Sequence, residues 1–354
     1  MTTAIPIAFK SAAAPEPVRD IFARPLRELR LSVIDRCNFR CTYCMPADSL
    51  QGRGVFLPLV KLLTEHEIER LLTAFVALGV EKVRITGGEP LVRPGLPALI
   101  KAIAGIPGIR DIALTTNGVL LPRLAEDLAE AGLARITVSL DTLDQDVLSE
   151  MSGGKAVLEE ILEGIVAAEA AGFKGIKINT VVQKGVNDHT ILDLLEHFRG
   201  TGHVVRLIEF MDVGNSNHWR REQVVPSAEW VRRINEVWPL EPLERNRRSE
   251  TARRYAYQDG QGEIGFISSI SEPFCGGCSR ARITADGIFY TCLFANKGTA
   301  LVPLLRQSRD EDALRERIAR VWTDRKDRYS ELRSAGGEKH EPKVPKVEMY
   351  RMGG

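Results

Sequence analysis

The sequence predicts an α/β fold: an incomplete parallel barrel of six βα units, (βα)6, followed by a smaller C-terminal part with antiparallel hairpins. Between residues 29 and 211, short β-branched runs alternate with longer helical patterns. Such repeats return each strand in the same direction. The strand-like runs alternate polar and apolar side chains, whereas a parallel sheet covered on both faces would be apolar throughout. Six units also fall short of the eight that close a barrel.

Four of the six runs, 29–34, 82–86, 135–140 and 175–182, show this alternation, because successive side chains of a strand point to opposite faces. Arg30, Arg84 and Lys177 lie on the polar faces of their runs, opposite residues such as Leu31 and Val83. We expect the apolar faces to meet helices and the polar faces to surround a positively charged lumen that holds a polar ligand. The expected strands are 29–34, 82–86, 111–115, 135–140, 175–182 and 204–210.

The helices between these strands are indicated by their ends. Thr64, with Glu67 three residues later, predicts a capping box at a helix start. Gly79, Gly132 and Gly172 stand where helices are expected to stop. The expected helices are 64–78, 96–104, 122–131, 155–171 and 189–198.

After residue 211 the pattern changes to helices and hairpins. The expected elements are a helix at 227–237, a hairpin of strands 253–257 and 263–267, a hairpin across 283–292, and a helix at 310–322. The charged stretch 324–346 predicts a mobile segment, and the terminal Gly353-Gly354 a frayed end. The predicted division is a flexible N-terminal extension (1–24), a partial barrel (25–214), a C-terminal part that carries the second cysteine group (215–322) and a tail (323–354).

Composition favours a globular, metal-binding protein. The 354 residues include 48 basic and 47 acidic side chains and are 44% hydrophobic, enough for a large core. No apolar run reaches the roughly 20 residues that cross a bilayer, so we expect no membrane partner. The Ala- and Pro-rich start lacks the apolar segment of a signal peptide. Six cysteines in two groups then favour metal ligation over disulfides, and a cytoplasmic location.

Cys37, Cys41 and Cys44 form a C-x3-C-x2-C group in one loop directly after the first strand. Three thiolates cannot complete a tetrahedral zinc site by themselves. A cubane iron–sulfur cluster can be held by three cysteines, with one iron open to another ligand. The alternative is a structural zinc or iron–sulfur site without catalysis.

The segment Thr86-Gly87-Gly88-Glu89-Pro90 ends the second strand, where parallel βα folds bind ligands. The glycines allow a small ligand to approach the backbone, and Glu89 can accept a hydrogen bond from an ammonium group. The alternative is a glycine-rich turn in which Pro90 opens the next segment.

Cys275, Cys278 and Cys292 form a second group, C-x2-C-x13-C, with no histidine between residues 252 and 339. Either zinc takes a carboxylate or water as its fourth ligand, or a second cluster keeps an open iron that can bind substrate. Arg280 and Arg282 come next and stand two residues apart on an expected strand. Both side chains therefore point the same way and can bind a triphosphate through paired hydrogen bonds.

The first cysteine group, with Tyr43, resembles the signature of radical S-adenosylmethionine (SAM) enzymes, and the glycine segment resembles their methionine-binding motif. From residue 24 to about 294, and again at Gly353-Gly354, the chain resembles one family of that superfamily, the GTP 3′,8-cyclases of molybdenum cofactor biosynthesis. The segments that carry this resemblance are 29–33, 37–46, 84–91, 115–118, 139–144, 208–211 and 275–292.

The resemblance implies a partial barrel of radical SAM type with two [4Fe-4S] clusters, one on each cysteine group, and SAM as a further cofactor. It implies that SAM contacts Tyr43, Gly88, Ser139 and Met211. It also implies that GTP is the substrate, with its guanine near the open iron of the second cluster and the chain's tail reaching into the site. The implied GTP contacts are Arg30, Arg84, Thr115, Lys177, Ala281 and the catalytic pair Arg280 and Arg282.

The implied reaction starts with removal of a hydrogen atom from ribose C3′ of GTP by a 5′-deoxyadenosyl radical. The C3′ radical then attacks guanine C8, giving (8S)-3′,8-cyclo-7,8-dihydroguanosine 5′-triphosphate. Implied partners are a reductant or electron-donor protein and the downstream cyclic pyranopterin monophosphate synthase; a homodimer is also possible. The sequence departs from the family at Asp212, usually proline, and at Ser279, commonly asparagine.

Two alternatives stay open at this point. A radical SAM maturase of a ribosomal peptide would also carry an auxiliary cluster, but such enzymes usually have more C-terminal cysteines and no need for Arg280 and Arg282. A non-enzymatic zinc or iron–sulfur regulator would use the basic residues 215–354, with 25 basic against 20 acidic side chains, on nucleic acid. The resemblance favours the cyclase, and we expect no nucleic-acid partner.

Overall fold

The computed structural model describes residues 15–47, 56–308, 310–335 and 346–353. Its strands form one sheet in the order β12-β11-β10-β1-β2-β3-β4-β5-β6-β9-β8-β7. The predicted six parallel strands are confirmed and pair in chain order. They are β1 (Glu28–Ser32), β2 (Lys82–Thr86), β3 (Asp111–Thr116), β4 (Arg135–Ser139), β5 (Lys177–Val182) and β6 (Val204–Glu209).

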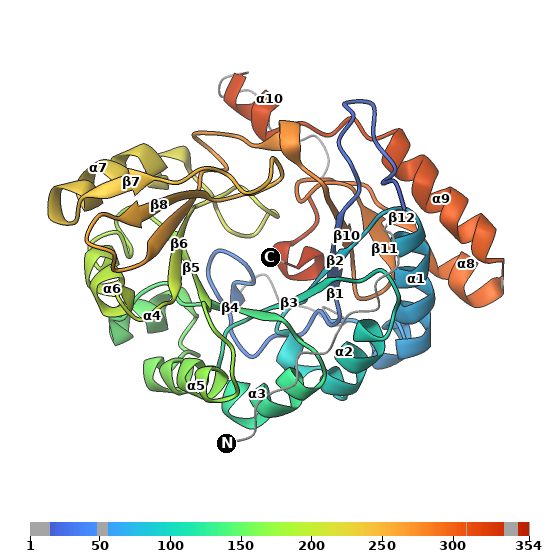
Figure 1. Cartoon of the computed structure of the whole chain (residues 1–354), viewed down its shortest axis with the longest axis horizontal. Helices are drawn as coiled ribbons and strands as arrows, with labels where there is room; N and C mark the ends of the chain where they lie inside the picture. Colours follow the sequence, from blue (N-terminus) through green and yellow to red (C-terminus); the bar gives the residue numbers. More distant parts are fainter. Residues whose placement is uncertain (1–14, 48–55, 309, 336–345, 354) are drawn as a thin grey trace.

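Helices follow each of the first five strands and lie outside the curved sheet, as Figure 1 shows. The predicted capping box is present: Glu67 N–H donates to Thr64 Oγ1 at 3.2 Å, and Thr64 N–H donates to Glu67 Oε2 at 2.8 Å. A short helix, α4, was not expected. The helices are α1 (Glu65–Ala77), α2 (Leu96–Ala104), α3 (Leu121–Glu130), α4 (Gln145–Met151), α5 (Leu158–Ala170) and α6 (Ile191–Phe198).

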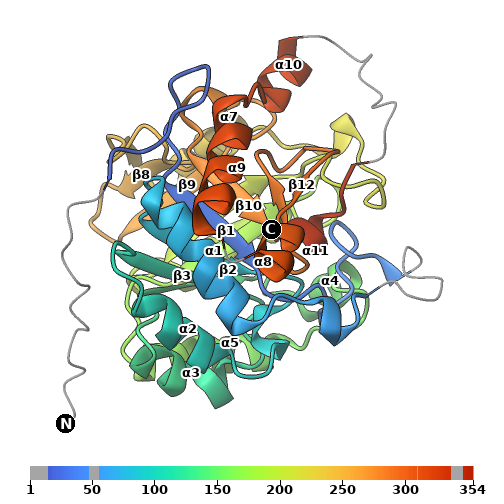
Figure 2. The ribbon, with the colours of Figure 1, turned by 90° about the vertical axis from the view of Figure 1, so that its right-hand side faces the viewer.

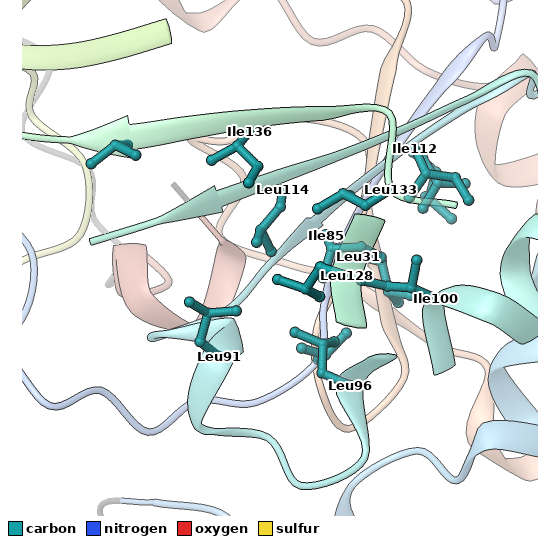
Figure 3. Packing of buried hydrophobic residues seen from close by; sticks show 14 of the residues in the cluster. Leu31, Ile85, Leu91, Leu96, Ile100, Ile112, Leu114, Leu128, Leu133 and Ile136 are labelled. Carbon is teal, nitrogen blue, oxygen red and sulfur yellow. The ribbon is translucent and has the colours of Figure 1, made fainter. Parts of the chain in front are cut away.

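The hydrophobic core lies between the sheet and these helices. Leu31 and Ile85 on neighbouring strands, with Ile100 of α2 and Leu128 of α3, are all fully buried. Figure 3 shows these side chains packed together on the helix-facing side of the strands. The apolar strand faces therefore meet helices, as the alternation predicts, and the polar faces are left for the interior.

The C-terminal part extends this sheet at both edges. The two predicted hairpins are confirmed, β8 (Arg253–Tyr257) with β9 (Glu263–Ile267) and β10 (Arg280–Ile283) with β11 (Ile288–Tyr290). The sequence did not predict that β9 would also pair in parallel with β6, and β10 with β1. The remaining elements are α7 (Ser227–Val237), β7 (Leu240–Pro242), β12 (Thr299–Ala300), α8 (Val302–Gln307) and α9 (Glu311–Thr323).

Both ends of the described chain are packed rather than loose. Residues 15–24 were expected to be flexible, yet Val18 N–H donates to Leu78 O at 3.0 Å, and Val18 O accepts from Leu26 N–H at 2.9 Å. The stretch expected to be mobile contains α10 (Tyr329–Ala335), while residues 336–345 lie outside the described residues. A last helix, α11 (Met349–Met352), lies beside β1 and β10 in both Figure 1 and Figure 2. No helix in the described ranges is long and apolar enough to span a membrane.

Candidate active site

A cavity of about 730 Å³ lies against the polar faces of the strands. Arg30, Arg84 and Lys177 line it, whereas Leu31 and Val83 are buried on the opposite side of the sheet. The predicted polar lumen is therefore confirmed. All six cysteines also line this cavity as free thiols, so both cysteine groups open into the same space.

The loop of the first cysteine group is shaped by its own backbone. The N–H groups of Cys44 and Met45 donate to Cys41 O at 3.0 and 2.8 Å, and Arg40 Nη1 donates to Cys37 O at 2.8 Å. Burial raises the pKa of Cys37 to about 11. Burial, and then the neighbouring thiols, raise the pKa values of Cys41 and Cys44 as well. Three thiolates here therefore require a compensating cation, which the irons of a cluster supply.

Each cysteine group presents three free thiols to the cavity. A tetrahedral ion draws all its ligands to one centre, whereas each thiolate of a cubane binds a different iron. Each triplet of cavity-facing thiols is thus compatible with a cluster that leaves one iron open.

The glycine segment after β2 packs against the cysteine loop. A Cβ on Gly88 would lie 2.3 Å from Arg36 O, so the close approach that requires glycine is to the protein's own backbone. Glu89 is 2% exposed and accepts hydrogen bonds from Asn117 N–H and Thr116 Oγ1, each at 2.7 Å. Burial raises the pKa of Glu89 to about 7. The segment therefore fixes the position of the cysteine loop relative to β2 and β3.

The four residues predicted to contact SAM, Tyr43, Gly88, Ser139 and Met211, all line the cavity. Tyr43 donates its hydroxyl hydrogen to Asp141 Oδ2 at 2.8 Å. Burial raises the pKa of Asp141 to about 6 and raises that of Tyr43. Asp141 lies in segment 139–144, which carries the family resemblance, but the sequence alone gave it no role. It orients Tyr43 next to the first cysteine group.

The predicted GTP contacts gather on the strands around the lumen. Arg84 Nη1 donates to Thr115 Oγ1 at 3.2 Å, and both residues line the cavity with Arg30 and Lys177. Burial, followed by the charge of Arg206, lowers the pKa of Lys177 to about 8. Cations that repel one another in a buried lumen are stabilised by an anion of several charges, such as a triphosphate.

Sequence reasoning missed several charged residues of this lumen. Lys82, Arg135 and Arg206 also line it. Burial opposes ionisation of Glu28, but Lys82 and Arg30 with their neighbours hold its pKa at about 2. Glu28 lies 3.5 Å from Lys82 and 3.8 Å from both Arg30 and Arg84, so it acts as an internal counter-ion.

The second cysteine group lies at the start of β10: Cys275 and Cys278 precede this strand, and Cys292 follows β11. Arg280 Nη2 and Arg325 Nη2 donate to Cys278 Sγ at 3.4 and 3.3 Å. Burial opposes ionisation, but these two guanidinium groups lower the pKa of Cys278 to about 6, whereas burial raises that of Cys292 to about 12. The predicted pair Arg280 and Arg282 both face the cavity.

The residue between the two arginines lies on the other face. The Ala281 side chain is fully buried in the apolar core, so a contact with GTP would have to use its backbone.

The C-terminal tail enters the cavity region, contrary to the expected frayed end. Arg282 Nη1 donates to Met352 O at 3.1 Å and also to Gly353 O. Gly353 lies against Thr86, at the end of β2, so closely that a side chain would collide with the threonine hydroxyl. Gly354 lies outside the described residues.

Comparisons with known proteins agree with this geometry. Residues 31–198 match the Radical SAM superfamily, and residues 203–331 match Molybdenum Cofactor Synthesis C. A protein of Xanthomonas campestris pv. campestris (strain 8004) named GTP 3′,8-cyclase is 53% identical over 96% of this chain and 98% of its own length. The chain belongs to the GTP 3′,8-cyclase family. Relatives of the same name from Acidothermus cellulolyticus and Staphylococcus epidermidis (strain ATCC 12228) are 49% and 42% identical, over 90% and 96% of this chain and 89% and 99% of theirs.

A solved structure shares the fold at low identity. Streptococcus suis SuiB superposes with a TM-score of 0.56 at 18% identity, covering 85% of this chain and 66% of SuiB. Membership of the GTP 3′,8-cyclase family makes this chain a radical SAM enzyme of molybdenum cofactor biosynthesis. The family resemblance seen in the sequence is thereby confirmed, and the regulator and maturase alternatives are not supported.

Proposed function

We propose that this chain converts GTP into (8S)-3′,8-cyclo-7,8-dihydroguanosine 5′-triphosphate, an early step of molybdenum cofactor biosynthesis. One observation carries the proposal: both cysteine groups and the cationic side chains of the strands line the same cavity. A triphosphate held by those cations would leave its nucleoside between the two cysteine groups. A cyclase needs this arrangement, because the radical source and the guanine must both reach one ribose.

Two [4Fe-4S] clusters and SAM would be held by this chain's own residues. Cys37, Cys41 and Cys44 would ligate the first cluster, and Cys275, Cys278 and Cys292 the second, each with an open iron. When bound, the first cluster supplies the electron that cleaves SAM.

Tyr43, Gly88, Ser139 and Met211 line the cavity beside the first group and would orient SAM there. Tyr43 is itself fixed by Asp141 at 2.8 Å.

The substrate-binding residues would act by charge and by position. Arg30, Arg84 and Lys177 would pair with the triphosphate, and Thr115 would hold Arg84 in place from 3.2 Å. Arg280 and Arg282 would reach the nucleotide from β10, next to the second cysteine group. Ring closure joins two atoms of the same GTP molecule, so holding ribose C3′ and guanine C8 near contact accelerates it by fixing their orientation.

The partners follow from this reaction. A reductant or electron-donor protein must supply one electron to cleave SAM and a second, with a proton, to reduce the nucleotide radical left after ring closure. Cyclic pyranopterin monophosphate synthase would consume the product. We also propose a cytoplasmic location, because free thiols and iron–sulfur ligation require reducing conditions. Homodimer formation stays a prediction.

Anaerobic incubation of the reconstituted protein with GTP, SAM and dithionite tests the proposal. Mass spectrometry should find 5′-deoxyadenosine and an isomer of GTP, and metal analysis about eight irons per chain, two cubanes of four. As a control, Cys37→Ala should form neither product. Zinc without acid-labile sulfide, or deoxyadenosine without the isomer, would contradict the proposal.

A further inference from the structure

A group of buried charges lies beside the second cysteine group, and one of its members, Arg325, also lines the cavity. It consists of Asp20, Arg24 and Arg325, whose side chains are at most 2% exposed. Arg24 Nε lies 2.6 Å from Asp20 Oδ2, and Arg325 Nη1 lies 3.7 Å from the same oxygen. Asp20 and Arg24 come from the segment before β1, and Arg325 follows α9. We call these three residues the bracket.

The bracket contacts two of the three cysteines directly. Arg24 Nη1 donates to Cys275 O at 3.0 Å. Arg325 donates from Nη1 to Cys278 O at 2.9 Å and from Nη2 to Cys278 Sγ at 3.3 Å. Two guanidinium groups thus hold the backbone of the loop, and one of them also holds a candidate ligand sulfur.

Surrounding contacts keep the bracket in this geometry. Asp20 Oδ1 accepts the backbone N–H groups of Phe22 and Arg24 at 3.0 and 2.9 Å. Trp322 of α9 donates its ring N–H to Arg24 O at 3.1 Å, and its ring lies 4.5 Å from the guanidinium carbon of Arg325. Figure 1 shows the segment before β1 running beside α9. The charges are therefore part of the packed structure.

The charges of the bracket do not balance by themselves. Two buried arginines face one buried carboxylate, and an uncompensated buried charge is strongly destabilising. Asp327 lies 3.4 Å from Arg325 Nε, but its side chain is 29% exposed and it also accepts a hydrogen bond from Thr291. Arg325 Nη2 donates to Cys278 Sγ at 3.3 Å, so a cluster-bound thiolate at Cys278 would supply the missing negative charge. Residues that hydrogen-bond a ligand in this way orient it and tune the metal group that it binds.

We propose that Asp20, Arg24 and Arg325 position the second cysteine group and set the reduction potential of the cluster bound there. They are positioning residues, because Arg24 and Arg325 contact the cysteines directly and Asp20 holds both arginines. The inference rests on the proposed second cluster. It also gives residues 15–24 a role in the active site, although they lie outside the barrel.

The test measures both clusters in the full-length, anaerobically reconstituted protein. Iron and acid-labile sulfide are counted per chain, and a redox titration followed by electron paramagnetic resonance gives both midpoint potentials. The signal that SAM changes belongs to the first cluster, and the signal that GTP changes belongs to the second. The variants are Arg325→Met, Arg325→Lys and Asp20→Asn. Arg315→Met is the matched control, since Arg315 is an exposed arginine of α9 that pairs with Asp312.

The proposal predicts shifts of opposite sign at the second cluster only. Arg325→Met removes a positive charge, so the ratio of reduced to oxidised cluster at fixed potential should fall about tenfold, or about 59 mV for a one-electron couple. Asp20→Asn removes a negative charge and should raise the potential, while Arg325→Lys should lower it less than Arg325→Met. A purely structural role would not give opposite signs.

Each result of these measurements supports or contradicts the role proposed for the bracket. If Arg325→Met loses about four of about eight irons while the SAM-responsive signal persists, the positioning role is supported. If Arg325→Met does not fold, Asp20→Asn and Arg325→Lys decide by the signs of their shifts. Full iron content with unchanged potentials, or equal shifts in both clusters, would overturn the inference. Wild-type protein with only about four irons would instead refute the second cluster itself.

Discussion

Replacing Gly353 by alanine tests whether the tail must dock for cyclisation. Gly353 has φ +69°, a left-handed conformation that costs an L-residue about 1–2 kcal/mol. The new methyl group would also collide with the hydroxyl of Thr86, which is 1% exposed and backed by the sheet. Together these effects should cost about 3 kcal/mol, comparable to a hydrogen bond from the charged Arg282 to a tail carbonyl. At 1.4 kcal/mol per tenfold, the docked tail should then be depopulated about a hundredfold.

The assay is anaerobic turnover with mass spectrometry of the cyclised nucleotide, alongside iron content. Gly353→Ala should cyclise GTP about a hundredfold more slowly with both clusters intact, and deletion of Gly353-Gly354 should abolish cyclisation. Gly260→Ala is the matched control, because Gly260 has φ +76° but no atom within 4 Å of an added Cβ, in the turn between β8 and β9. It should lose about 1–2 kcal/mol of stability and keep its turnover. Wild-type turnover of Gly353→Ala would refute the role given to the tail.

Three further predictions concern the cavity. Arg280→Ala should weaken GTP binding by about 10- to 100-fold without loss of iron, because one charge-assisted hydrogen bond is lost. Calorimetry that finds unchanged GTP affinity would count against phosphate binding by Arg280. Tyr43→Phe should weaken SAM binding and lower stability by about 1–3 kcal/mol, since the buried Asp141 carboxylate loses the Tyr43 hydroxyl and keeps the Val181 N–H; equal denaturation midpoints would argue against this. GTP affinity should fall as pH rises from 7 to 9, because Lys177, with a pKa of about 8, loses its positive charge. Lys177→Arg should make GTP affinity nearly independent of pH over this range, because arginine stays charged. Parallel pH profiles for the wild type and Lys177→Arg would exclude Lys177 as the titrating group.

The barrel and its lumen could be predicted because strand alternation is a local signal. Arg30 and Arg84 each stand between apolar neighbours, and their faces follow from the period of two. Arg206 obeys the same rule, but it is the one polar residue among Val204, Val205, Leu207 and Ile208, so its run gave no alternation to notice. The charged residues at the strand starts, Glu28 and Lys82, were passed over although they share the polar face with Arg30 and Arg84.

Contacts between distant segments could not be predicted from sequence. The parallel pairing of β10 with β1 joins residues about 250 positions apart, and neither strand carries a mark of its partner. Asp20 and Arg24 looked like part of a loose extension, because their burial depends on Trp322 and Arg325 near the other end of the chain. The docking of Gly353 likewise depends on Arg282 and Thr86.

The central claim is that a radical formed at the first cysteine group reaches GTP held in the same cavity. GTP carrying deuterium at C3′, incubated anaerobically with SAM, dithionite and the reconstituted protein, tests it most directly. We predict that the 5′-deoxyadenosine formed carries the deuterium and that the cyclised nucleotide lacks it. Unlabelled 5′-deoxyadenosine beside a cyclised product that keeps its deuterium would contradict the account.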